Sequence, residues 1–396
     1  MHSCEYQAKL HEILENSLRT AFSLSAQYVQ RSHLDFMSLF ILALMSSKSV
    51  QYQAVAAEME GAALEASKVR RIQHFMAEFD LDYTCVAHFM LMLLSEQGKI
   101  TFCLDRTEWS FGETTHNLLV LTAYSHGLGI PIWFECVNQN GGCCDVDDKM
   151  YMLLQCLEIL GKERIKCLIA DSEFIGEEWV EFLMQEGIAF YLDVRSNQYF
   201  TYQDKRHQIE AFMRGKSKAE LRNIRIFKQS LHIGIKRQKE CAKGKRKAFL
   251  AVVTNATQAG ILSVYKNRWS IEVLFQSFKK RGFDIQATHL DDPIRLRKLF
   301  ALVAMAFITA FTAGLAIQAH KPIPIKNHGY KENSFFRKGK DFLRTVDKSK
   351  GKVKNKIQTK TAEFQAIFQI FSKMLTDFLQ KIKKKSIHSQ YIKIVM

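Results

Sequence analysis

The sequence lacks the cysteine spacing of a zinc site. Its nine cysteines include no Cys-x-x-Cys pair, and no histidine stands at ligand spacing from any of them. We therefore interpret them as reduced thiols of a cytoplasmic protein and expect no structural zinc ion. The first residues, Met1 to Glu5, also lack the basic and apolar regions of a signal peptide, which favours the same compartment.

Long hydrophobic runs are equally scarce. A single stretch, Leu299–Gln318, has no charged residue and is long enough to span a bilayer. Its content of Ala, Thr and Gly, and the lack of a second such segment, instead favour a helix buried inside a globular domain. We expect no membrane association. A membrane-associated protein is a rival interpretation that rests on this stretch alone.

What the chain does have is a formal net charge of +16, unevenly distributed. Residues 99–194 carry 6 Lys and Arg against 16 Asp and Glu, whereas residues 195–248 carry 16 against 4 and residues 320–396 carry 19 against 5. An acidic segment followed by basic ones is what a cation-dependent site beside a nucleic-acid surface requires. Solvated charged faces explain single basic runs but not this segregation.

A chain of 396 residues is too long for one compact core, and we expect three parts. Residues 1–98 predict a helical N-terminal domain, with helices near 34–46, 50–60 and 66–79. Lys68, Arg70 and Arg71 in the last of these favour DNA binding, and a plain packing domain is the alternative. Residues 291–396 predict a basic, helical C-terminal region, whose helix at Phe364–Ile382 either pairs protomers or packs on its own chain.

Residues 99–290 predict an α/β catalytic core. The apolar pattern changes to a period of two, and we expect strands at 100–105, 118–123, 130–137, 165–170 and 189–194 with helices at 147–160 and 177–185. Three antiparallel strands followed by alternating helices and strands is the order of a ribonuclease-H-like fold. In that fold the first and fourth strands are neighbours, so Asp105 and Asp171 would emerge side by side. Residues 195–254 interrupt the core as a β-rich, basic insertion.

A long helix is predicted from about residue 260 to residue 280. At about 100° per residue, Tyr265, Arg268, Glu272 and Lys279 share a face about 60° wide, with the apolar residues on another side. A carboxylate flanked by cations suits a metal ligand whose neighbours hold phosphates. Taken alone, an ordinary surface pair of Arg268 and Glu272 explains the pattern more simply.

These spacings, however, resemble a known family. Tyr265-x2-Arg268-x3-Glu272-x6-Lys279 matches at every spacing the Y-R-E-K signature of the insertion-sequence-four family of DDE transposases. Leu104–Trp109 and Ile169–Phe174 resemble the two aspartate blocks of that family, although Ser172 stands where arginine is commoner. Ser334–Gly339 resembles a C-terminal motif of the family. The resemblance implies a bacterial DNA transposase that works by cut and paste.

The resemblance also implies roles for individual residues. Asp105, Asp171 and Glu272 would be catalytic and would ligate two Mg²⁺ or Mn²⁺ ions in each active site. Tyr265, Arg268 and Lys279 would bind DNA phosphates near the transposon end. The partners would be terminal inverted repeats and target DNA, held by a homodimer, with a DNA hairpin as intermediate. Glu108 and Glu173 are left out of the ligand set, and Asp193, which ends the fifth strand, is a weaker candidate for which a structural role is favoured.

Several roles stay open. One aromatic of the insertion is expected to receive a flipped base, with ordinary packing as the alternative for each of the candidates Tyr199, Phe200, Tyr202 and Phe227. The lysines of 348–360 and 383–385 would add salt-sensitive DNA affinity or belong to a solvated tail. The rival functions are a metal-dependent DNA nuclease of the same fold without strand transfer, and a DNA-binding protein whose catalytic site is unused.

Overall fold

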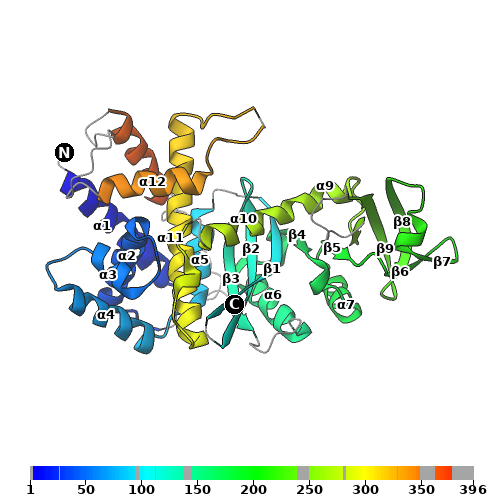
Figure 1. Cartoon of the computed structure of the whole chain (residues 1–396), viewed down its shortest axis with the longest axis horizontal. Helices are drawn as coiled ribbons and strands as arrows, with labels where there is room; N and C mark the ends of the chain where they lie inside the picture. Colours follow the sequence, from blue (N-terminus) through cyan, green and yellow to red (C-terminus); the bar gives the residue numbers. More distant parts are fainter. Residues whose placement is uncertain are drawn as a thin grey trace, which may run out of the picture. The chain divides into compact units, whose positions relative to one another are not determined.

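The structure is a computed structural model of the chain. It describes residues 3–25, 27–94, 98–111, 113–137, 145–238, 249–279, 282–327, 329–347 and 362–376. The chain divides into two compact units (Figure 1). One contains Met1–Ser95 and Gln276–Met396, and the other contains Glu96–Phe275.

The first unit is helical. Its elements are α1 (Ser3–Phe22), α2 (Arg31–Ser46), α3 (Tyr52–Glu58), α4 (Glu65–Glu78), α5 (Tyr83–Leu93), α11 (Pro293–His320), α12 (Phe335–Asp347) and a helix at residues 362–376. The three helices predicted between residues 34 and 79 are present as α2, α3 and α4. The last helix lies within the segment predicted at Phe364–Ile382, whose residues beyond 376 are outside the described ones.

The uncharged stretch forms the centre of α11 and is buried among helices of its own unit. Asp292 caps this helix by accepting hydrogen bonds from the backbone N–H groups of Ile294 and Arg295, and Pro293 starts the first turn. Of the helices that the structure describes, α11 is the one long and apolar enough to cross a membrane, and 94% of its apolar window is buried. Its packing against α2, α5 and α12 is that of a core helix.

Two glycines allow α12 to cross α11 at very close range. A Cβ atom added to Gly339 would lie 1.7 Å from the carbonyl oxygen of Ala310, and one added to Gly314 would lie 1.9 Å from that of Phe335. No side chain fits at either position, because the opposing atoms belong to the backbone. Gly339 of the Ser334–Gly339 segment therefore has a packing reason to be glycine.

The second unit is built on one mixed sheet. Its strands are β1 (Ile100–Phe111), β2 (Thr114–Ser125), β3 (Leu128–Val137), β4 (Ile165–Ala170), β5 (Phe190–Val194), β6 (Tyr199–Tyr202), β7 (Lys205–Gln208), β8 (Lys218–Ile226), β9 (Gln229–Arg237) and β10 (Phe249–Thr254). They run in the order β3-β2-β1-β4-β5-β10-β9-β8-β6-β7. The helices of this unit include α6 (Val146–Leu160) and α7 (Glu177–Gln185). The predicted mixed α/β class is confirmed.

The strands expected for the core are present, and their pairing positions the two aspartates. β1, β2 and β3 are antiparallel, and a tight turn at His126 and Gly127, both with positive φ, joins the last two. β4 runs parallel to β1 and β5 runs parallel to β4. The expectation that the first and fourth strands are neighbours is therefore confirmed.

The inserted strands extend the same sheet. β10 pairs antiparallel with β5, and β9, β8, β6 and β7 follow outward from it. Figure 1 shows these strands as a continuation of the core strands within this unit. The insertion is β-rich, as predicted, but it has no separate sheet of its own.

The helix predicted from 260 to 280 is interrupted. α9 (Ile261–Tyr265) is followed by a 3-10 turn at Lys266–Arg268, and α10 (Trp269–Phe278) begins after it. The flanking residues Tyr265 and Trp269 have ψ angles of −25° and −22°, values typical of a 3-10 helix. The prediction of one continuous α-helix is thus wrong at the 3-10 turn, where the Asn267 carbonyl leaves the α-helical pattern and accepts a hydrogen bond from the Cys103 thiol.

Candidate active site

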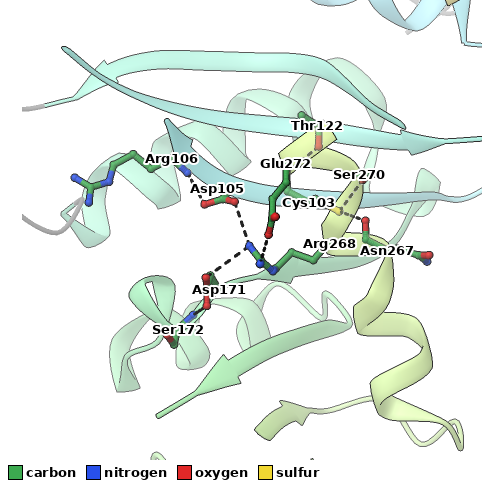
Figure 2. Close-up of polar contacts among 10 residues, drawn as sticks. All are labelled: Cys103, Asp105, Arg106, Thr122, Asp171, Ser172, Asn267, Arg268, Ser270 and Glu272. Atoms are coloured by element: carbon green, nitrogen blue, oxygen red, sulfur yellow. Dashed lines mark hydrogen bonds and ion pairs between the residues drawn. The ribbon is translucent and has the colours of Figure 1, made fainter. Parts of the chain in front are cut away.

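Two aspartates follow directly on paired residues of neighbouring parallel strands. Leu104 of β1 is in register with Ala170 of β4, and Asp105 and Asp171 are the next residues in each case. One oxygen of each carboxylate accepts a backbone N–H: Asp105 from Arg106 at 2.8 Å, and Asp171 from Ser172 at 2.6 Å. These bonds fix both side chains, so that their second oxygens face the same space (Figure 2).

The guanidinium of Arg268 lies in that space. Its Nη1 is 3.2 Å from Oδ2 of Asp105 and 3.6 Å from Oδ2 of Asp171, and its Nη2 donates to Oε1 of Glu272. Figure 2 shows the three carboxylates converging on this group from β1, from the end of β4 and from α10. The structure therefore brings Asp105, Asp171 and Glu272 together around one cation.

The cluster is largely removed from water. The exposed fractions of the side chains are 14% for Asp105, 19% for Arg268, 28% for Glu272 and 33% for Asp171. Burial raises the pKa of Asp105 to about 7, although Arg268 and a backbone hydrogen bond act in the opposite direction. For Arg268, burial lowers the pKa, but Tyr265 and the neighbouring carboxylates outweigh it and keep the guanidinium charged.

The start of α10 is held against the sheet by small side chains. The Cys103 thiol donates to the Asn267 carbonyl at 3.6 Å, and its sulfur lies 3.8 Å from Oγ of Ser270. A Cβ atom on Gly129 of β3 would lie 3.2 Å from both the Ser270 carbonyl oxygen and Cα of Ile271. Glu272 therefore reaches the aspartates because α10 lies directly on the sheet at a glycine.

Two residues beside the cluster had no role assigned from the sequence. Nη2 of Arg106 lies 3.2 Å from Oε2 of Glu173, and Nη1 of Arg106 is 3.4 Å from Oδ1 of Asn117. Glu173 also contributes to the raised pKa of Asp105, after burial and Asp171. Their positions in the sequence could have indicated this: Arg106 directly follows Asp105, and Glu173 is the second residue after Asp171. Glu108, by contrast, is half exposed and 3.9 Å from Nη1 of Arg106.

The remaining residues of the Y-R-E-K pattern differ in their surroundings. Tyr265 is buried, with 6% of its surface exposed, and its ring centroid is 6.0 Å from Cζ of Arg268. Burial, and next to it the charge of buried Asp193, raises the pKa of Tyr265. Tyr265 therefore lies beside Arg268, on the side of the helix that faces the carboxylates, but it is buried rather than open to solvent. Lys279 follows α10 in the helical unit, and its phosphate-binding role stays a prediction.

The aromatic residues of the insertion are not equivalent. Phe200 is buried, whereas Tyr202 and Phe227 are partly buried. Tyr199 is 47% exposed, and Cζ of Arg206 lies 4.5 Å from its ring centroid. An exposed ring beside a guanidinium can stack on a nucleic-acid base, whereas a buried ring cannot. Lys243–Lys247, Lys348–Lys360 and Lys383–Lys385 lie outside the described residues.

A second group with metal-ligating side chains lies in the helical unit. His11, Glu15 and Asp35 have ligand atoms within 4.8 Å of one another. Glu15 is paired with Arg19 at 2.6 Å and Arg31 at 3.0 Å, and Asp35 with Arg71 at 2.8 Å. Three arginines against two carboxylates leave no negative charge to attract a divalent cation.

The charge balance at Asp105, Asp171 and Glu272 is the reverse. In the ion pairs that the structure describes here, three carboxylates contact one guanidinium, so acidic groups outnumber cationic ones in a poorly solvated place. Carboxylate oxygens are the ligands that Mg²⁺ and Mn²⁺ prefer. The donor set of the sheet unit therefore fits the cation that the resemblance implies, and that of the helical unit does not.

Comparison with known proteins points the same way. Residues 96–308, more than half of the chain, match the family described as "Transposase DDE domain". No curated protein matches the chain in sequence. Among solved structures, the chain is similar to the cryo-EM structure of the piggyBac transposase synaptic complex with hairpin DNA. The TM-score is 0.46 and the identity 10%, over 86% of this chain and 77% of that one.

Proposed function

The chain belongs to the transposase DDE-domain family, and we propose that it cuts the ends of its element and joins them to target DNA. The observation that carries the proposal is the convergence of Asp105, Asp171 and Glu272 on one guanidinium. Bringing three partly buried acids from separate parts of the chain around one guanidinium costs stability, and such costs cluster at functional sites.

Asp105, Asp171 and Glu272 would hold two Mg²⁺ or Mn²⁺ ions. When bound, such ions activate the attacking water or 3′-hydroxyl and stabilise the leaving oxygen. The fixed backbone hydrogen bonds of the two aspartates keep their outer oxygens in place for this purpose. Arg268 would bind the phosphate next to the scissile bond through its forked N–H groups, and Lys279 would add a point charge. Tyr265 would hold the Arg268 side chain in position, because its buried ring lies next to that side chain.

The same proposal assigns the other parts of the chain. Residues 1–98 would bind the terminal inverted repeats, and the exposed Arg70 and Gln73 of α4 support this. Lys68 and Arg71 are less available, since Lys68 donates to the Met59 carbonyl at 2.6 Å and Arg71 pairs with Asp35. The 195–254 insertion would clamp DNA, and residues 291–396 would contribute to a homodimer that holds both ends. The chain would act in the bacterial cytoplasm. Its catalytic core would be ribonuclease-H-like and would span residues 99–290.

Cleavage of labelled DNA that carries the flanking sequence of the gene tests the proposal. We expect Glu272→Ala to abolish cleavage in Mg²⁺ and to leave binding of the same DNA intact. Glu178→Ala on α7 is the matched control, because Glu178 is an exposed glutamate of the same unit. Retained cleavage in the Glu272 variant would contradict the proposal. A plasmid integration assay then distinguishes a transposase from a nuclease that lacks strand transfer.

A further inference from the structure

We propose that Arg268 keeps divalent cations out of the carboxylate site until a DNA phosphate draws its guanidinium away. This inference rests on the proposed function, because it assumes that Asp105, Asp171 and Glu272 are the metal ligands. It adds a regulatory role to Arg268. The same side chain would block the site in the free protein and bind substrate in the complex.

The geometry of the free site supports this role. Each of the three carboxylates has an oxygen directed at the guanidinium, at 3.2 Å for Asp105 and 3.6 Å for Asp171, with Glu272 hydrogen-bonded to the other nitrogen. Among the described residues, His11, Glu15 and Asp35 form a group whose ligand atoms all lie within 4.8 Å of one another. The three carboxylates around Arg268 do not form such a group. The guanidinium therefore occupies the space between the three carboxylates in which bound cations would lie.

Charge makes the two occupants exclusive. A divalent cation bound to the same oxygens would lie within a few ångströms of the guanidinium, where like charges repel strongly because little water screens them. Arg268 cannot avoid this by losing its proton, because an arginine guanidinium stays protonated in proteins. The cation can therefore bind well only after the guanidinium has moved.

A DNA phosphate supplies the reason to move. The forked N–H groups of arginine bind a phosphate in the same two-bond manner as a carboxylate. The Arg268 side chain is 19% exposed, so it is not sealed inside the fold. If the phosphate takes Arg268, the three acids lose the cation that they share in the free protein and gain affinity for metal. Because such coupling is reciprocal, metal would also strengthen binding of the DNA end.

Mn²⁺ binding to the full-length, DNA-free protein tests this inference, measured by electron paramagnetic resonance of the free ion. We expect Arg268→Ala to raise Mn²⁺ affinity by about tenfold or more, which is within the range of typical coupling between two sites. Arg268→Gln, which keeps hydrogen bonding but removes the charge, should show the same gain and guards against a folding defect in the alanine variant. Arg106→Ala is the matched control. It also removes an arginine close to the site, but the ion pairs of Arg106 are with Glu173 and Glu108.

The outcomes separate the inference from the function on which it rests. Suppose that the wild type and both Arg268 variants bind Mn²⁺ equally well, and that adding Glu272→Gln abolishes this binding. The proposed blocking role of Arg268 would then be wrong, whereas the proposed metal site would stand. A gain in the Arg106 variant as large as that in the Arg268 variants would also overturn it, because it would be a general charge effect. If Glu272→Gln leaves Mn²⁺ binding unchanged in the wild type and in both Arg268 variants, the result would instead contradict the proposed function.

Discussion

Asp105 and Asp171 share one nitrogen of Arg268, at 3.2 Å and 3.6 Å. They reach it because their strands are parallel neighbours that are in register up to the residue before each aspartate. The two acids are therefore equivalent in register, although Asp105 lies within β1 and Asp171 follows the end of β4.

This equivalence predicts equal losses. Asp105→Asn and Asp171→Asn should each lower the rate of Mg²⁺-dependent DNA cleavage by about a thousandfold or more, since each removes a charged ligand of a cooperative site. Glu108→Gln is the control. It lies three residues after Asp105 on the same strand but is half exposed, and it should retain cleavage. Loss of activity in the Glu108 variant would mean that the ligand set is wrong.

Packing of α10 on β3 predicts an effect at a distance from the chemistry. In Gly129→Ala the new methyl group would crowd the backbone of Ser270 and Ile271 at about 3.2 Å, so α10 must shift by a few tenths of an ångström. We expect a loss of about 1 kcal/mol in the free energy of unfolding and a larger loss of cleavage, because Glu272 moves with α10. Gly98→Ala, which meets nothing within 4 Å, is the matched control. Unchanged cleavage in the Gly129 variant would show that the position of α10 is not critical.

Much of this site could be predicted from local pattern. Alternating apolar residues located the strands that Asp105 and Asp171 follow, and the spacing of Arg268 and Glu272 put both on one helical face. The burial of Tyr265 and the 3-10 turn that follows it could not be predicted, since both lie against residues distant in the chain, such as Cys103, whose thiol contacts the Asn267 carbonyl. The same is true of β10, whose place beside β5 depends on pairing between strands that an insertion separates in sequence.

The exposed ring of Tyr199 predicts a role in DNA binding. Tyr199→Ala should weaken binding of DNA that has an unpaired base near its end by about tenfold, the usual contribution of one base stacked on an aromatic side chain. Tyr330→Ala is the control, because Tyr330 is also strongly exposed but lies in the helical unit. Fluorescence anisotropy with fully paired and mismatched duplexes measures the difference. Equal losses on the two duplexes would argue against base stacking.

Lys340 predicts a pH dependence of stability in the helical unit. Its ammonium is buried, donates to the Gly282 carbonyl at 2.7 Å and lies 4.4 Å from the Phe283 ring centroid. Burial, with Arg344 and Arg337 adding to it, lowers the pKa of Lys340 from 10.5 to about 8. Between these two pH values the unfolded chain holds the proton and the folded protein has released it. The free energy of unfolding should therefore rise with pH across this window.

Comparison with Lys340→Met isolates that contribution, because the other groups titrate in both proteins. We expect the stability difference, wild type minus variant, to increase by up to about 3 kcal/mol between pH 8 and pH 10.5. Urea unfolding at a series of pH values measures it. If the free energy of unfolding depends on pH in the same way in both proteins, the charge on Lys340 does not destabilise the folded state.

The most direct test of the account is to map where a divalent cation binds in the folded protein. Fe²⁺ with ascorbate and peroxide cuts the backbone next to its site. We predict cuts near Asp105, Asp171 and Glu272 together, weak in the DNA-free wild type and strong in Arg268→Ala, competed by Mg²⁺ and absent when Glu272→Gln is added. Cuts near His11, Glu15 and Asp35 instead, or cuts near only one of the three acids, would contradict a shared metal site.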